Sequence, residues 1–535
     1  MSTVTRRELL RMAGLFGAGS VVPASSVSAA QARPAAPASP QASNVYEAIG
    51  VRPLINCRGT FTIIGGSIEL PEVRAAKSAA NQQFVQLDEL MDAVGKRLAE
   101  LTGAEWGMVS AGCAAAMSHA TAACVAGGNP DLHVRIPNLA GFAKDEVIVP
   151  GNSRNVYDAA IRAVGVKIIE ADTPDALQLA IGPRTAMIYI FAGPQNDTGP
   201  MSTEAICTIA KQHAVPVLVD AAAEILTIPN VHLQRGATLV AYSGGKYIRG
   251  PQSAGLLLGR KELVQAAWIH SAPHHGYARS MKVGREEMVA MLTAVESWVK
   301  RDHAAEWKEW VGRCQYIADR ASKIAGVTSS VKQEPDEGLS NRSPSVSIRW
   351  ESAGFGITGQ QVADTLYNSE PRITLNGSRA GTGAQDGTGD TGISIVVSMM
   401  AAGEEKIVAQ RIADVLSAKH TVKPEEALAS PIADVSGRWE IAIRYAASTT
   451  SHGLHLRQIG NRLEGVHQGN FLSRDISGTI SGDTVLLASN VTERHGDALS
   501  YRFKGTVTGE SMSGSLDLGE YRAATWTARR AQARG

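Results

Sequence analysis

The chain reads VAYSGGKYIRGP from Val240 to Pro251, and this stretch decides how the rest of the sequence is interpreted. An apolar run that ends in Ser-Gly-Gly-Lys is typical of a buried strand followed by a tight turn that carries a lysine. A second apolar run, Val215–Val219, ends at Asp220. Because ligands of open parallel sheets lie beyond the carboxyl ends of the strands, we expect Lys246 and Asp220 at one site.

Around these two segments, apolar runs alternate with helical patterns from about Tyr46 to Lys419. The runs that predict strands are 107–109, 146–149, 166–170, 186–191, 215–219, 238–242 and 254–258. The patterns that predict helices between them are 85–101, 113–125, 155–164 and 203–213. This alternation predicts an α/β domain over residues 45–420, with a mainly parallel sheet covered by helices on both faces and a smaller α/β subdomain.

Residues 434–535 have a different pattern, in which short alternating strands are separated by glycines. Even strand spacing of this kind predicts a small antiparallel β-barrel or sandwich. Trp439 and Trp526 are expected in its core. His452, His455 and His467 are candidate metal ligands, but scattered histidines on strands are more often surface or core residues, and no metal site is predicted.

The composition excludes several classes of protein. The chain has 535 residues, with 52 Lys and Arg against 51 Asp and Glu, so it has no basic excess for nucleic-acid binding through bulk charge. Its 44% of hydrophobic residues excludes disorder over the whole chain. Five cysteines are too few, and odd in number, for a disulfide framework.

The N-terminus is predicted to be an export signal over residues 1–32. An arginine pair, Arg6 and Arg7, precedes an apolar Gly/Ala-rich run and small residues suited to cleavage. This pattern resembles a twin-arginine signal, which implies a periplasmic protein, although an ordinary secretory signal remains open. Residues 33–44 are rich in Pro and Ala and are predicted to be a linker. No membrane span is expected in the mature chain.

The residue types at the strand ends suit pyridoxal phosphate. A lysine such as Lys246 can form a Schiff base with the aldehyde of this cofactor. A buried carboxylate such as Asp220 can keep the pyridine nitrogen protonated. Ser243 stands three residues before Lys246 and is placed to hydrogen-bond the cofactor phosphate.

A second phosphate-binding element is predicted at residues 110–116. This segment follows a predicted strand and opens an Ala-rich helix, so it supplies a helix N-terminus. Its small side chains let the backbone N–H groups of Gly112, Cys113 and Ala114 approach a phosphate. A tight turn without a ligand is the alternative when this segment is considered alone.

These segments resemble the fold-type I pyridoxal-phosphate enzymes, and among them bacterial selenocysteine synthase and glucosaminate-phosphate ammonia-lyase-like proteins. The motifs that carry the resemblance are 52–56, 102–105, 219–222, 243–246 with 250–255, and 281–287. The resemblance covers roughly residues 46–418. It implies that Lys246 binds the cofactor covalently, that Asp220 pairs with its ring nitrogen, and that the protein is a homodimer or a higher homo-oligomer.

Two positions depart from this family pattern. Ser153 stands where relatives usually have a histidine, and Asn376 stands where relatives often have an arginine that is a candidate carboxylate binder. Arg372 or Arg379 is a candidate to take over that role. The full set of candidate substrate-binding arginines is Arg154, Arg279, Arg372 and Arg379.

The family resemblance implies an enzyme that acts on an amino acid or amino-sugar acid, with Lys246 as the proton shuttle. The expected reaction is α-proton abstraction followed by elimination, which is a lyase reaction. Aminotransferase, racemase and aldolase reactions remain open because a fold does not fix a reaction. A binding protein that has lost catalysis is a further alternative. The selenium-transferase reaction is not expected, because charged tRNA is not expected in the periplasm and the chain has no basic excess. No nucleic-acid partner is therefore expected.

Overall fold

The computed structural model describes residues 44–333, 338–378, 390–420, 427–492 and 498–531. The predicted export signal, nearly all of the predicted linker and Arg379 lie outside these ranges. The short helix η1 (Glu47–Ile49) belongs to a first unit that ends at Pro53, and the elements described below belong to a second unit that begins at Leu54. Within the described ranges, no helix combines the length and apolarity needed to cross a membrane.

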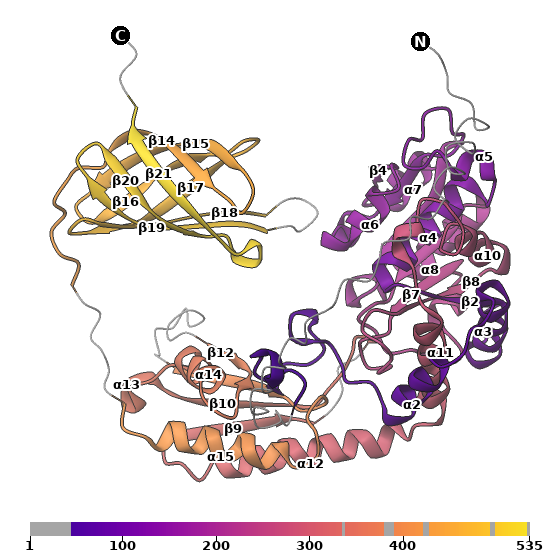
Figure 1. Ribbon diagram of the computed structural model, residues 1–535, viewed down its shortest axis with the longest axis horizontal. Helices are drawn as coiled ribbons and strands as arrows, with labels where there is room; N and C mark the ends of the chain where they lie inside the picture. Colours follow the sequence, from indigo (N-terminus) through magenta and orange to yellow (C-terminus); the bar gives the residue numbers. More distant parts are fainter. Residues whose placement is uncertain (1–43, 334–337, 379–389, 421–426, 493–497, 532–535) are drawn as a thin grey trace, which may run out of the picture. The chain divides into compact units, whose positions relative to one another are not determined.

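A seven-stranded sheet forms the centre of the α/β region (Figure 1). In spatial order its strands are β2 (Trp106–Ser110), β8 (Gly255–Gly259), β7 (Leu239–Ser243), β6 (Val217–Asp220), β5 (Thr185–Phe191), β3 (Glu146–Val149) and β4 (Lys167–Glu170). Strand β8 is antiparallel to both of its neighbours, and the other pairings are parallel. The central strands are apolar runs with buried side chains, as expected for a sheet covered by helices.

Several helices pack against this sheet. Those that contact its strands are α3 (Leu87–Thr102), α4 (Cys113–Ala126), α10 (Lys261–Ile269) and α11 (Arg285–Lys300). Helix α2 (Pro71–Ala80) packs on α11, and α8 (Thr203–Gln212) contacts α7 (Pro174–Ala180). Helix α4 contacts β5, β7 and β8 and is buried almost all round, which its run of alanines permits. Helices α3 and α11 contact β2 and each other.

A smaller α/β subdomain follows the large sheet. Its four-stranded antiparallel sheet has the order β12 (Asn376–Gly377), β13 (Asp390–Val396), β10 (Ser345–Glu351) and β9 (Val327–Lys332). Helices α12 (His303–Ala321), α14 (Gly359–Asn368) and α15 (Glu404–Ser417) pack with it. A separate parallel pair, β1 (Ile55–Asn56) with β11 (Ile373–Thr374), joins the start of this unit to the subdomain.

The C-terminal region is a closed antiparallel barrel of eight consecutive strands (Figure 1). Its strands are β14 (Gly437–Arg444), β15 (Thr449–Ile459), β16 (Arg462–Gln468), β17 (Ser473–Ser481), β18 (Thr484–Thr492), β19 (Ala498–Thr508), β20 (Ser511–Asp517) and β21 (Ala523–Arg530). Trp439 and Trp526 are each 1% exposed in its core. The predicted fold class is therefore confirmed, and of its two C-terminal alternatives the barrel is the correct one.

Candidate active site

Asp220 ends the central strand β6, and its side chain is 1% exposed. Its carboxylate accepts hydrogen bonds from the Tyr189 hydroxyl at 3.1 Å, the Ala222 N–H at 3.0 Å and the Cys113 thiol at 3.4 Å. Burial raises the pKa of Asp220, and these three donors act in the opposite direction. The carboxylate is thus held in one orientation, and a positive group beside it would favour its ionised form.

The predicted phosphate turn lies next to this carboxylate. Gly112 has a φ of +94°, a conformation that favours glycine, and it caps the 14-residue helix α4. A Cβ on Gly112 would meet nothing within 4 Å, so there is open space in front of the turn. The next residue, Cys113, points its buried thiol at Asp220. Two segments predicted separately, the turn and the aspartate, are therefore brought together.

Ser243 is also brought to the turn, through the strand register. It ends β7 and pairs with Gly255 on β8, which in turn pairs with Ser110 on β2. A Cβ on Gly255 would overlap with the backbone of Gly112 and Cys113, so β8 passes directly under the turn. Only glycine permits this close approach, which places Ser243 and the amides of the turn along one edge of the sheet.

Lys246 follows β7 in a compact turn. Its amine donates a hydrogen bond to the backbone oxygen of Thr60 at 3.0 Å, and burial lowers its pKa. The turn needs both glycines of the Ser-Gly-Gly-Lys sequence, because a Cβ on Gly244 or Gly245 would crowd the segment that contains Gln252. A partly buried amine with a lowered pKa is a better nucleophile and proton acceptor than an exposed lysine.

Polar residues that the sequence analysis missed support Asp220. Asn155 donates to the Tyr189 hydroxyl at 3.2 Å and to the backbone oxygen of Ser153 at 2.9 Å. Asn196 donates to the fully buried Ser153 hydroxyl at 3.3 Å. The sequence feature that could have pointed to this support is Tyr189, which places a phenol in a largely apolar strand.

The four candidate substrate-binding arginines lie apart from this group or outside the described residues. Arg154 forms ion pairs with Asp158 and Glu170, at 2.6 and 2.5 Å. Arg372 donates to the backbone oxygen of Tyr367 and stacks on its ring. Arg279 is exposed in the short helix η6 (Arg279–Met281), and Arg379 is not among the described residues. None of the three that are described lines the cavity at Lys246.

A cavity of about 420 Å³ opens at Lys246 and is called the lysine cavity below. Its wall includes four basic residues: Arg58, Lys246, Lys332 and Arg342. No acidic residue belongs to the wall in the part of the chain that the structure describes. Asn341 also lines it, and its buried Oδ1 receives no hydrogen bond from the described residues. The lysine cavity therefore favours an anionic ligand with a hydrogen-bond donor.

Arg58 is the basic residue whose position the structure explains best. The pairing of β1 with β11 brings residues 55–60 beside residues 373–376. Arg58 Nε then donates to Asn376 Oδ1 at 3.0 Å. Relatives were expected to carry an arginine at position 376. In this chain that position is Asn376, and an arginine from a distant segment, Arg58, binds its side chain instead. The sequence analysis did not identify Arg58.

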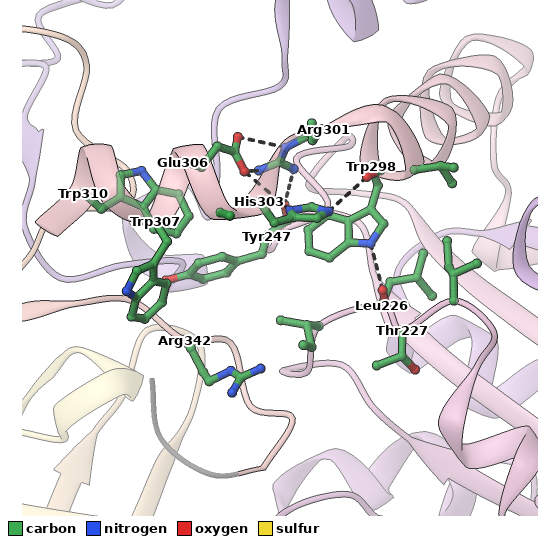
Figure 2. Close-up of a pocket in the computed structure, with 14 residues that line it drawn as sticks. Leu226, Thr227, Tyr247, Trp298, Arg301, His303, Glu306, Trp307, Trp310 and Arg342 are labelled. Carbon is green, nitrogen blue, oxygen red and sulfur yellow. Dashed lines mark hydrogen bonds and ion pairs between the residues drawn. The ribbon is translucent and has the colours of Figure 1, made fainter. Parts of the chain in front are cut away.

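A second cavity, of about 650 Å³, shares Tyr247 and Arg342 with the wall of the lysine cavity. We call it the indole cavity because Trp298, Trp307 and Trp310 line it. Figure 2 shows the ring of Tyr247 between those of Trp298 and Trp307, and Arg301 joined to Glu306. The Trp298 indole donates to the Leu226 backbone oxygen at 2.8 Å, which fixes this wall. Aromatic walls with a few fixed polar groups are typical of small-molecule sites.

These residues fit pyridoxal phosphate. The space in front of Gly112 suits a phosphate at the N-terminus of α4. Asp220 is a buried carboxylate in need of a positive partner, which a protonated ring nitrogen supplies. Lys246 offers a partly buried amine for covalent attachment.

Comparison with known proteins agrees with this fit. Residues 87–299 match the family described as Cys/Met metabolism PLP-dependent enzyme. The chain is 29% identical over 339 residues to a D-glucosaminate-6-phosphate ammonia lyase of Salmonella typhimurium, covering 62% of this chain and 88% of that protein. It is 31% identical over 345 residues to a 5'-C-glycyluridine monooxygenase-decarboxylase of a Streptomyces species, covering 62% of this chain and 83% of that protein.

The fold has a counterpart among solved structures. The structure of a D-glucosaminate-6-phosphate ammonia-lyase superposes with a TM-score of 0.61 at 27% sequence identity. The match covers 70% of this chain and 98% of that one.

Proposed function

The chain belongs to the fold-type I pyridoxal-phosphate enzymes, in the group of glucosaminate-phosphate ammonia-lyase and selenocysteine synthase, and from this premise we propose that it is a lyase. The proposed substrate is an anionic amino acid or amino-sugar acid, and the proposed reaction removes its α-proton and eliminates ammonia or another β-substituent. The observation that carries this proposal is the lysine cavity, with four basic residues in its wall. The ammonia-lyase relative agrees with it.

Each residue of the site has a distinct part in this chemistry. Pyridoxal phosphate, when bound, supplies an electron-withdrawing ring that stabilises negative charge at the substrate α-carbon. Asp220 holds a proton at the ring nitrogen, and Tyr189 and Cys113 fix the orientation of its carboxylate. Lys246 takes the α-proton on its Nζ, and its lowered pKa favours the neutral amine that this step needs.

Arg58 is proposed to bind the substrate carboxylate. Its guanidinium lies in the wall of the lysine cavity and is held there by Asn376. Arginine suits a carboxylate because its planar group can donate two parallel hydrogen bonds. This assignment replaces the expectation that Arg372 or Arg379 takes over from the arginine missing at Asn376.

The indole cavity is proposed to hold the far part of the substrate. It adjoins the lysine cavity through Tyr247 and Arg342, so one molecule can extend from one cavity into the other. The faces of the indole rings suit a sugar or another ring. The Arg301–Glu306 ion pair can form hydrogen bonds with the polar groups of that ring. The substrate would thus be larger than a simple amino acid.

The test of the cofactor and the reaction starts from the absorption spectrum of wild-type and Lys246→Ala protein. We expect a band at about 410–430 nm in the wild type only, which borohydride fixes onto the peptide that contains Lys246. Amino acids and phosphorylated amino-sugar acids are then screened for release of ammonia and a keto acid. A band with no turnover of any compound would contradict the lyase and favour a binding protein. Transfer of the amino group without release of ammonia would favour an aminotransferase.

The protein is further proposed to reach the periplasm through the twin-arginine route. The arginine pair at Arg6 and Arg7 supports this, and so do the five cysteines, all free and buried, which need no oxidative pairing. Replacing both arginines with lysine should abolish export of the full chain. Export that continues would contradict the route.

A homodimer is proposed on the basis of exposed apolar side chains in the segments that flank α2, one of which, Phe61, lines the lysine cavity. Phe61, Ile63, Ile68 and Phe84 are 49%, 86%, 65% and 97% exposed, and they come from the segments before and after α2. Such a group of exposed apolar residues marks an interaction surface. Light scattering should give twice the chain mass, and a fully active monomer would contradict the proposal.

A further inference from the structure

The interior of the C-terminal barrel is divided into an apolar part and a polar part. The apolar part contains large side chains such as Trp439, Phe503 and Trp526. Near one end of the barrel, inward positions carry His452, His467, Arg474, Ser489 and Tyr501, which we call the polar chamber. The chamber lies next to the hairpins that join β14 to β15 and β16 to β17.

Arg474 is the charged residue of the polar chamber. Arg474 is 8% exposed, and its guanidinium carbon Cζ lies 4.8 Å from the centroid of the Tyr501 ring. Its Nε and Nη1 atoms are buried and have no hydrogen-bond partner among the residues that the structure describes. The buried residues of the described barrel include no Asp or Glu. A buried cation without an anionic partner is costly, which points to a partner from outside the chain.

The two histidines do not supply that partner. His452 Nδ1 lies 2.9 Å from His467 Nε2, and His467 Nδ1 lies 2.8 Å from the Ser489 hydroxyl, so the three side chains bind one another. The pKa of His467 is lowered to about 3, chiefly by burial, with smaller contributions in the same direction from His452 and from the charge of Arg474. Both histidines are therefore neutral near pH 7, and the chamber carries the single positive charge of Arg474.

A cavity of about 360 Å³ opens at the same end of the barrel. Arg474 does not line this cavity, but Tyr501, whose ring Arg474 covers, does. Tyr445, Leu499 and Leu518 also line it, so much of its wall is apolar. Arg522 is the one charged residue of its wall in the described part of the chain, and it too is basic. Barrels of eight strands are wide enough to hold one small ligand.

We propose that the barrel binds one organic monocarboxylate, whose carboxylate accepts hydrogen bonds from the buried Arg474 guanidinium and whose apolar body lies against Tyr445, Tyr501 and Leu499. The barrel site would only bind its ligand, whereas the site at Lys246 attaches a cofactor and catalyses a reaction. Amino acids are poor ligands for it, because no carboxylate of the described lining residues would pair with their ammonium group. The barrel would therefore sense or hold a different molecule from the substrate.

The test measures binding to the full-length protein by calorimetry. Benzoate and hexanoate are the probes, and benzyl alcohol and inorganic phosphate are the comparators. We expect one site per chain for a carboxylate and no binding of benzyl alcohol. Arg474→Met should weaken carboxylate binding at least tenfold, whereas Arg457→Met, an exposed arginine on β15, should leave it unchanged. Binding that survives Arg474→Met, or binding of phosphate but of neither carboxylate, would overturn the proposal.

Thermal melting separates loss of binding from loss of folding. Arg474→Met removes a buried unpaired charge, so the ligand-free variant should melt at the same temperature as the wild type or higher. The carboxylate should raise the melting temperature of the wild type and not that of the variant. If Arg474→Met fails to fold, Arg474→Lys keeps the charge and should bind more weakly than the wild type. Equal binding by Arg474→Lys and wild type would then count against the assigned role of the guanidinium.

Discussion

Asp220 and Arg474 are two buried charges of opposite sign in one chain, and they differ in what surrounds them. The Asp220 carboxylate accepts hydrogen bonds from Tyr189, Ala222 and Cys113, which fix its orientation without any ligand. Arg474 has a ring beneath it, but two of its nitrogens have no partner in the described chain. The first site is preorganised for a cofactor, whereas the second obtains its missing hydrogen bonds only when a ligand arrives.

The largest expected effect tests the preorganised site. Lys246→Ala should lower kcat/KM by at least about 10³-fold, because it removes both the covalent attachment of the cofactor and the group that moves the α-proton. The rate of the identified reaction and borohydride labelling of the peptide are measured together. Lys300→Ala, at the end of α11, serves as the control and should behave as the wild type. Full labelling of the Lys246→Ala protein at another lysine would contradict the assignment.

The next effect concerns the charge of Asp220. Asp220→Asn keeps the shape but cannot hold a proton at the ring nitrogen, so we expect a loss of about 10²-fold in kcat. Because burial raises the folded pKa of Asp220 above 3.8, the cofactor-free protein should lose stability as pH rises through that raised value. Asp220→Asn should flatten this pH dependence, and bound cofactor should reverse it. Thermal melting of both proteins with and without cofactor measures this, and identical pH profiles would contradict it.

Much of the fold could be predicted from the sequence because the strands are short apolar runs with clear ends. The run at 146–149 matches β3, and the run at 186–191 differs from β5 by one residue. The prediction of a continuous helix over 155–164 was wrong, because only 159–162 is α-helical and 156–158 forms a 3-10 turn. Its Asn155 side chain caps that turn and also binds Tyr189, so local geometry here serves the site.

The position of the candidate site could be predicted where its residues are close in sequence to a strand end, as Lys246, Ser243 and Asp220 are. Arg58 could not be found in this way, because its place depends on the pairing of β1 with β11, more than 300 residues later in the chain. The indole cavity depends likewise on the packing of the α11–α12 junction against residues 225–228. The unpaired nitrogens of Arg474 are equally invisible in the sequence, since alternation shows only that the side chain points inward.

Arg58 gives a third test, of a charge on the wall of a cavity. Arg58→Met should raise KM about 10- to 100-fold with a small change in kcat, because a charge-assisted hydrogen bond to the substrate is lost. Arg372→Met is the matched control, since Arg372 is held by Tyr367 away from the lysine cavity. A larger effect of Arg372→Met than of Arg58→Met would reverse the two assignments. Asn376→Ala should give a smaller rise in KM than Arg58→Met, because it removes only the group that positions Arg58.

The smallest expected effect is on the stability of the barrel at low pH. It tests whether the polar chamber carries only one positive charge, that of Arg474. His467 has an ordinary pKa of 6.5 and a folded pKa of about 3. Between these two pH values its imidazole is protonated in the unfolded chain but neutral in the folded barrel. The barrel should therefore lose stability as pH falls below 6.5, by about 2 kcal/mol at about pH 5. Hydrogen exchange of the barrel strands in the full chain measures this opening free energy. His467→Gln should remove most of the acid sensitivity, whereas His455→Gln, on the outer face of β15, should retain it. Equal acid sensitivity in His467→Gln and wild type would mean that His467 is not kept neutral by burial and by the charge of Arg474, and the single-charge description of the chamber would fail.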